Sequence, residues 1–288
     1  MNAMQTLAML VVLSLPVTAV AQSSNPASAP AAAAPADAPL PRRAGPLGVQ
    51  LALTAGIEAV LPGSAADRAG VKAGSVIQSV NGKAIQRREQ VSEAMRGVKA
   101  GESVQLVLKL PDGSLSTVAV KTEPALERLQ GSTVTYGSVR VPDGYRLRTI
   151  VTEPKESPLA KNGKLPAFLY VSGIICDTID RPNQPDAVDT RIVHAMANAG
   201  FMTMRVDKPG VGDSEGPPCS EIDLQTELAG YSAALKQLSE MPGVDPQRIY
   251  VFGHSMGGVL APYLSRVDRK STRLNSSHEW ISRMPSSA

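Results

Sequence analysis

The chain lacks the features that mark several specialised classes of protein. Its 288 residues include only two cysteines, which excludes a disulfide-rich scaffold and a four-cysteine zinc site. The chain has a formal net charge of +3, but this excess lies in its last twenty residues, because residues 1–268 hold 25 basic and 25 acidic side chains. A nucleic-acid partner needs a basic face on a folded domain. The sequence therefore predicts no nucleic-acid partner, and we expect no metal and no cofactor.

A long hydrophobic run is also missing, but a short one lies near the N-terminus. Leu7 to Val20 is a mainly apolar run that is broken by Pro16 and ends in small residues up to Ala21. A membrane span needs about 20 apolar residues, so we expect no stable membrane span. The run predicts a signal peptide over residues 1–21 and a periplasmic or secreted protein. No Lys or Arg precedes Arg42, so a buried helix of the mature protein is the alternative.

What the chain does have is enough apolar residues for about two folded domains. Hydrophobic residues make up 43% of the sequence and charged residues 19%, which is typical of globular proteins. Residues 22–42 differ, because they are mainly Ala, Pro and Ser and have little to bury. This composition predicts a flexible linker between the signal peptide and the first domain.

Residues 43–123 alternate short apolar runs with glycine-containing turns. The Asn81-Gly82 pair after an apolar run is a strong signal for a hairpin turn. The pattern predicts a small β-rich domain with short helices. The expected strands are 47–51, 57–61, 76–80, 104–110 and 115–120, and the expected helices are 64–69 and 88–98.

The motif Pro62-Gly63-Ser64-Ala65-Ala66, with Ala69-Gly70-Val71 and Asn81-Gly82 after it, resembles the PDZ family in its bacterial secreted form. The resemblance implies that backbone N–H groups of Leu47, Gly48 and Val49 hold a peptide's C-terminal carboxylate. The peptide would add as a strand beside the helix at 88–98. The expected partner is a peptide or protein C-terminus, and a PDZ-shaped spacer without a ligand is the alternative.

From residue 131 the pattern changes to a longer alternation of strands and helices. Residues 167–171 form a near-continuous apolar run, as expected of a strand buried on both faces. The pattern predicts an α/β domain over residues 131–268. The expected strands are 133–141, 145–151, 167–171, 201–206 and 248–252, and the expected helices are 189–199, 222–238 and 259–264.

The most informative motif lies between the last of these strands and the last helix. Gly253-His254-Ser255-Met256-Gly257 has the spacing of a nucleophile elbow, a tight turn that lifts a serine above the sheet. Glycine is needed on both sides because the turn leaves no room for side chains. An oxyanion at this serine would be stabilised by the next backbone N–H and by the helix dipole.

Residues 205–214 are similar to the glycine-rich loop of α/β-hydrolases, and residues 244–250 also resemble that family. Residues 131–268 thus resemble the first half of an α/β-hydrolase of the serine-aminopeptidase or esterase-like kind. The expected fold class is α/β, with an incomplete α/β-hydrolase sheet preceded by a PDZ-like domain. The resemblance implies that Ser255 is the nucleophile for a small ester or peptide substrate. Met256 and Ile174 would supply the backbone N–H groups of the oxyanion hole.

The same resemblance predicts a disulfide between the two cysteines. Cys176 follows the strand at 167–171 and Cys219 follows the strand at 201–206. These strands are neighbours in an α/β-hydrolase sheet, and their loops emerge at the same edge. An exported protein meets an oxidising compartment, which favours the bond. Two free buried thiols are the alternative.

The α/β-hydrolase order places a catalytic Asp or Glu and then a His after the nucleophile. Only 33 residues follow Ser255, and residues 269–288 resemble a non-native tail found on unrelated translated sequences. His278 lies in this tail with no strand to carry it to the elbow, so we do not expect it to be the base. We expect the chain as written to be inactive. The rivals are a non-catalytic periplasmic peptide-binding adaptor and an acyltransferase on the same fold.

Overall fold

The structure of the chain, a computed structural model, describes residues 39–267. The predicted signal peptide, residues 22–38 of the predicted linker and the tail with His278 lie outside the described residues. No helix within the described range is both long and apolar enough to span a membrane.

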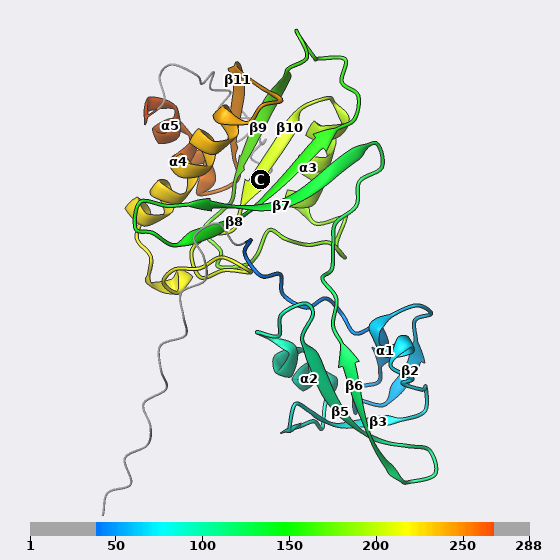
Figure 1. The fold of residues 1–288 in the computed structure, drawn as a ribbon. Helices are drawn as coiled ribbons and strands as arrows, with labels where there is room; N and C mark the ends of the chain where they lie inside the picture. Colours follow the sequence, from blue (N-terminus) through cyan, green and yellow to red (C-terminus); the bar gives the residue numbers. More distant parts are fainter. Residues whose placement is uncertain (1–38, 268–288) are drawn as a thin grey trace, which may run out of the picture. The chain divides into compact units, whose positions relative to one another are not determined.

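The first part of the described chain is the predicted small β-rich domain (Figure 1). Strands β3, β4, β5 and β6 form one sheet in the order β4-β3-β5-β6, and β1 pairs with β2 in a second sheet. Its core contains the strand residues Ile77, Val104 and Leu106, none of which is exposed to solvent. The elements are β1 (Val49–Leu51), β2 (Ile57–Val60), α1 (Ala65–Arg68), β3 (Val76–Val80), β4 (Lys83–Ala84), α2 (Arg88–Met95), β5 (Ser103–Lys109) and β6 (Leu115–Lys121).

Helix α2 ends earlier than the predicted boundary at residue 98. Arg96 leaves the helical conformation with a ψ of 121°, and Gly97 follows with a φ of 94°. Val98 is nevertheless buried in the core of the domain. Val98 is therefore buried as its helical spacing in the sequence predicts, although it lies after the end of the helix.

The second part of the chain is built around a five-stranded sheet in the order β7-β8-β10-β9-β11. Strand β8 is antiparallel to both β7 and β10, while β10, β9 and β11 run parallel. Strands β9 and β10 are neighbours, as predicted. The elements are β7 (Ser132–Arg140), β8 (Arg146–Pro154), β9 (Leu165–Val171), α3 (Val188–Asn198), β10 (Met202–Val206), the 3₁₀ turn η1 (Cys219–Glu221), α4 (Leu224–Glu240), β11 (Val244–Gly253) and α5 (Gly257–Val267).

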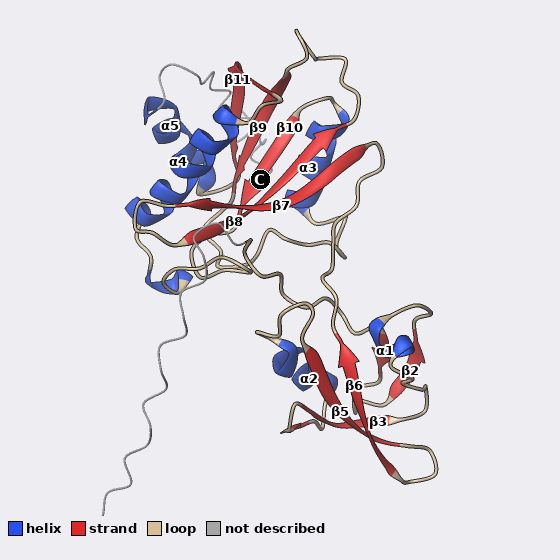
Figure 2. Ribbon diagram, in the orientation of Figure 1, coloured by secondary structure: helices blue, strands red, loops and turns tan. Residues whose placement is uncertain are grey.

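Helices cover both faces of this sheet (Figure 2). Successive side chains of β9 point to opposite faces. Leu169 and Val171 belong to the core that holds the apolar residues of α4 and α5, whereas Phe168 and Tyr170 pack with Val193 of α3. The sheet therefore has α4 and α5 on one face and α3 on the other, and β9 is buried between them.

The last residues of the predicted linker make specific contacts with the larger part of the chain. Leu40 is buried, and its carbonyl accepts a hydrogen bond from the guanidinium of Arg148. The Arg42 guanidinium pairs with Asp180 at 2.5 Å and with Asp213 at 2.7 Å. Composition alone cannot predict such contacts, because the partners are distant in the sequence.

Candidate functional site: a strained serine at a sheet edge

The turn between β11 and α5 has the geometry that the glycine-serine-glycine motif predicts. Ser255 has a φ of 55°, in the left-handed region that costs an ordinary residue about 1 kcal/mol. A Cβ added at Gly253 would lie 2.0 Å from the carbonyl oxygen of Gly257. A Cβ added at Gly257 would lie 2.3 Å from that of Val171. Only glycine fits on either side of this serine.

Ser255 opens onto a cavity of about 230 Å³ at the end of the sheet. One wall is apolar and comes from Ile174, Ile175 and Val188, all of which are exposed. Arg181 also lines the cavity and is paired with Asp177 and Asp189. The cavity beside the serine is therefore lined by apolar side chains and by an ion-pair cluster of one guanidinium and two carboxylates.

Two backbone N–H groups near Ser255 remain available. Among residues 39–267, the N–H groups of Met256 and Ile174 donate no hydrogen bond. Gly173, next to Ile174, lies against the serine, because a Cβ built on it would be 3.3 Å from the Cβ of Ser255. The structure thus brings the two predicted oxyanion donors to the same place as the predicted nucleophile.

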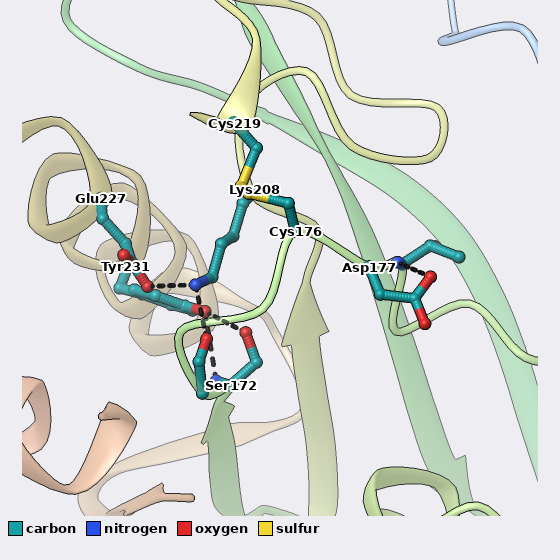
Figure 3. Close-up of a disulfide and its surroundings, with 9 residues drawn as sticks. Ser172, Cys176, Asp177, Lys208, Cys219, Glu227 and Tyr231 are labelled. Atoms are coloured by element: carbon teal, nitrogen blue, oxygen red, sulfur yellow. Dashed lines mark hydrogen bonds and ion pairs between the residues drawn. A yellow bond between two sulfur atoms is a disulfide. The ribbon is translucent and has the colours of Figure 1, made fainter. Parts of the chain in front are cut away.

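Buried polar side chains hydrogen-bond the backbone of the loop after β9 (Figure 3). The ammonium of Lys208 donates to the carbonyl of Gly173 and lies 2.9 Å from Oε1 of Glu227. The hydroxyl of Tyr231 accepts from the N–H of Ser172 at 3.1 Å. Burial raises the pKa of Tyr231, so this phenol remains protonated and can also hydrogen-bond the Ser172 hydroxyl.

Cys176 and Cys219 form a disulfide, as predicted. The bond joins the loop after β9 to η1, which directly precedes α4 (Figure 3). No free cysteine remains in the chain. The loop that carries Ile174 is therefore fixed covalently two residues beyond the candidate oxyanion donor.

Removing this bond should destabilise the protein substantially. The cysteines are 43 positions apart, and closing a loop of that length stabilises a fold by roughly 4 kcal/mol on the chain-entropy estimate. We expect the Cys176→Ser/Cys219→Ser double variant to lose about that much free energy of unfolding in urea titrations. Reduced wild-type protein should have the same free energy of unfolding as the variant. Equal free energies of unfolding for the oxidised wild type and the variant would contradict the prediction.

The glycine-rich loop after β10 is held by buried carboxylates. Asp207 accepts from the N–H of Ile179 at 2.8 Å and from the hydroxyl of Thr178 at 2.9 Å. Burial raises the pKa of the Asp207 carboxyl to about 7, against the effect of these hydrogen bonds. Gly212 approaches this carboxylate so closely that an added Cβ would lie 2.3 Å from Oδ2. Asp207 is thus a structural residue of the loop.

No general base contacts the serine in the part of the chain that the structure describes. The Ser255 hydroxyl has no hydrogen-bond partner there, and His194 is paired with the buried Glu127 at 2.8 Å. His254 is exposed, and its imidazole makes no hydrogen bond within residues 39–267. That range also contains no group of three or more His, Cys, Asp or Glu residues placed to hold a metal ion.

The smaller domain has a second candidate site at the loop before β1. Gly48 has a φ of 86°, and an added Cβ would lie 2.1 Å from that of Ser64. The Gly48 carbonyl accepts from Leu61, so the backbone of this residue faces the neighbouring strand. Val49 is offset by one position, and its backbone groups therefore face the opposite edge. Within the described chain, the N–H groups of Leu47 and Gly48 donate no hydrogen bond.

Sequence reasoning missed the ion pair of Lys208 and Glu227. Glu227 and Tyr231 are four residues apart on α4, so both lie on the helix face that packs on the sheet. A glutamate on an otherwise apolar face was the available signal. Lys208 is the second residue after β10, at the end of the sheet where the serine lies.

Comparisons with known families agree with this two-part organisation. A model of the PDZ domain matches residues 56–110, and a model of the serine aminopeptidase S33 family matches residues 187–274. The smaller part is therefore similar to a PDZ domain, and the larger part is similar to an α/β-hydrolase.

Three relatives illustrate the range of similar proteins. Polyketide transferase claH of Penicillium crustosum is 30% identical over 86 residues, which is 30% of this chain and 28% of the relative. Thiohydrolase aneE of Aspergillus aculeatus is 34% identical over 62 residues, covering 22% and 20% of the two chains. A hypothetical protein of Pseudomonas aeruginosa with a crystal structure is 21% identical, covers 52% of this chain and 44% of its own, and has a TM-score of 0.44. The chain thus spans less than half the length of each.

Proposed function

We propose that the chain is part of an exported serine hydrolase that cleaves an ester or peptide bond through an acyl-enzyme at Ser255. The observation that carries this proposal is the left-handed conformation of Ser255 at the junction of β11 and α5. A fold accepts such strain at a functional site when the conformation itself is needed. Two further observations support the proposal: Ile174 lines the same cavity as Ser255, and the N–H groups of Met256 and Ile174 donate no hydrogen bond among residues 39–267.

The arrangement fits nucleophilic acyl transfer. The Ser255 oxygen attacks the substrate carbonyl carbon, and the hydroxyl proton passes to a general base. The N–H groups of Met256 and Ile174 donate to the oxyanion that forms. Collapse of this intermediate breaks the bond to the alcohol or amine, which leaves with the proton. Water then releases the acyl group as a carboxylic acid and regenerates the serine.

The base and its orienting carboxylate are proposed to lie beyond the described residues, at the ends of later strands. Reading the source gene past the codon of Asp268 tests this. An Asp or Glu followed by a His is the expected finding, whereas a gene without them favours the peptide-binding adaptor. The 288-residue chain alone is expected to show no hydrolysis of p-nitrophenyl acetate, and the assays below therefore use the full-length natural protein.

A fluorophosphonate probe tests the nucleophile directly. The serine oxygen should displace fluoride and form a stable phosphonyl ester, so peptide mass spectrometry should locate the added mass on Ser255. The Ser255→Ala variant and heat-denatured wild type should stay unlabelled. Labelling of a different serine, or equal labelling of the alanine variant, would rule out the proposed mechanism.

We further propose that the PDZ domain recruits peptide or protein C-termini at Leu47, Gly48 and Val49. The unpaired N–H groups before β1 suit a carboxylate, and the free edge of β1 suits an added strand. Fluorescence anisotropy with a C-terminal peptide library should identify ligands for the 288-residue chain. Amidation of the peptide C-terminus should weaken binding at least about tenfold, because charge-assisted hydrogen bonds are lost. Equal affinity of acid and amide would contradict carboxylate recognition.

An acyltransferase is the second candidate for the same site. It is favoured by the similarity to a protein named a polyketide transferase. Transferase and hydrolase share the acyl-enzyme and differ in the acceptor that attacks it. Product analysis with and without an added alcohol distinguishes them: an ester of that alcohol indicates transfer, and the free acid alone indicates hydrolysis.

A further inference from the structure

The loop after β9 carries an oxyanion donor but has little regular structure of its own. Ser172 to Asp177 lie between β9 and the next described turn, and Ile174 and Ile175 are exposed. A donor N–H is useful in catalysis only if its direction is fixed before the charge develops. The contacts that fix this direction therefore bear on the rate of the reaction.

Lys208 contacts the peptide unit that matters. Its ammonium donates to the carbonyl of Gly173, which belongs to the same peptide unit as the N–H of Ile174. No cis peptide bond occurs among the described residues. In a trans peptide the C=O and N–H point in opposite directions, so a bond that holds the carbonyl also sets the direction of the N–H. The hydrogen bond also polarises the peptide and strengthens the N–H as a donor.

The lysine is itself held in a way that surface lysines are not. Lys208 is only 4% exposed, and the Glu227 carboxylate lies 2.9 Å from its ammonium. A buried ion pair gains little net stability, because both charges lose their hydration. Stability alone therefore gives a weak reason for this pair. The geometry of the pair gives a stronger reason, because the pair holds the Lys208 ammonium within hydrogen-bond distance of the Gly173 carbonyl.

We propose that Lys208, held by Glu227, is a positioning residue that fixes the Gly173–Ile174 peptide and thereby aims the Ile174 N–H at the oxyanion formed on Ser255. The inference rests on the proposed function of Ser255. Tyr231 on the N–H of Ser172 and the disulfide at Cys176 hold the two ends of the same segment (Figure 3). The lysine holds its middle.

The Lys208→Met variant tests the proposal, because methionine keeps an apolar stem and removes the donor. In the full-length protein, kcat for p-nitrophenyl acetate should fall 10- to 100-fold while KM stays within about twofold. Affinity for an alkyl boronic acid, which forms a tetrahedral adduct on the serine, should fall in parallel with kcat. Lys208→Arg should restore part of the rate, because it supplies another donor.

Arg148→Met is the matched control. Arg148 is 1% exposed and 3.4 Å from Asp213, and it makes no hydrogen bond to the segment from Ser172 to Asp177. It should lower thermal stability while leaving kcat per folded molecule unchanged. A similar fall in kcat for both variants, or no fall for Lys208→Met, overturns the proposal. If Lys208→Met does not fold, Glu227→Gln and Lys208→Arg are measured instead, and unchanged kcat in both overturns it.

Failure of the proposed function gives a different result. If Ser255→Ala keeps the activity, the nucleophile is wrong and the effect of Lys208 on kcat has another origin. If Ser255→Ala is inactive and Lys208→Met is fully active, the nucleophile stands and only the positioning role fails.

Discussion

Replacing Ser255 with alanine or glycine should abolish hydrolysis by the full-length protein and separate catalysis from backbone strain. Both variants lack the nucleophile, so kcat should fall by about 10⁴-fold or more. Alanine keeps a Cβ at the φ of 55°, whereas glycine adopts that conformation without a steric cost. Ser255→Gly should therefore be more stable than Ser255→Ala by about 1 kcal/mol.

The measurements are p-nitrophenyl acetate hydrolysis and urea unfolding of the three proteins. Residual activity above one per cent of wild type in either variant would contradict the role of the serine as nucleophile. Equal stabilities of the glycine and alanine variants would show instead that the turn relaxes around residue 255. The two readouts are independent, because one depends on the hydroxyl and the other on the Cβ.

Replacing Gly257 with alanine should have the largest effect on the fold near the site. The added Cβ would lie 2.3 Å from the Val171 oxygen and 2.7 Å from that of Ser172, and both atoms belong to the backbone. Neither can move without shifting the end of β9 and the loop that carries Ile174. We expect a loss of about 3 kcal/mol or more in unfolding free energy, together with loss of activity.

Gly258→Ala is the matched control, one residue farther along the same helix. Its added Cβ would lie 3.5 Å from the oxygen of Gly253, an ordinary contact distance. Thermal unfolding should place this variant within about 0.5 kcal/mol of wild type, with activity retained, since alanine favours helix. Equal damage from the two substitutions would mean that helix α5, rather than the close approach of Gly257 to β9, is sensitive.

The elements of both domains could be predicted from the sequence because each follows a local pattern. Strand β3 has the predicted bounds, Val76–Val80, and the serine turn follows from five consecutive residues. The Cys176–Cys219 bond could be predicted from the expected order of the strands. These features depend on neighbouring residues or on a sheet topology that the resemblance supplied.

Buried charges could not be predicted in the same way. Arg205 and Glu127 carry charges that normally face water, and the sequence does not indicate that they are buried beside each other. Arg205 and Glu127 are 78 positions apart. Arg42 and Asp213 are 171 positions apart. Such pairs depend on how loops from different strands meet.

The chain enters and leaves the PDZ domain at adjacent points. Ala44 pairs with Pro124 in an isolated antiparallel bridge, and Gly45 donates to the carbonyl of Glu123. Just outside this bridge, Arg42 and Glu127 are each bonded to residues of the larger part. The two ends of the smaller domain therefore lie side by side. A short turn joining Arg43 to Ala125 could replace this domain while leaving both anchoring residues in the chain.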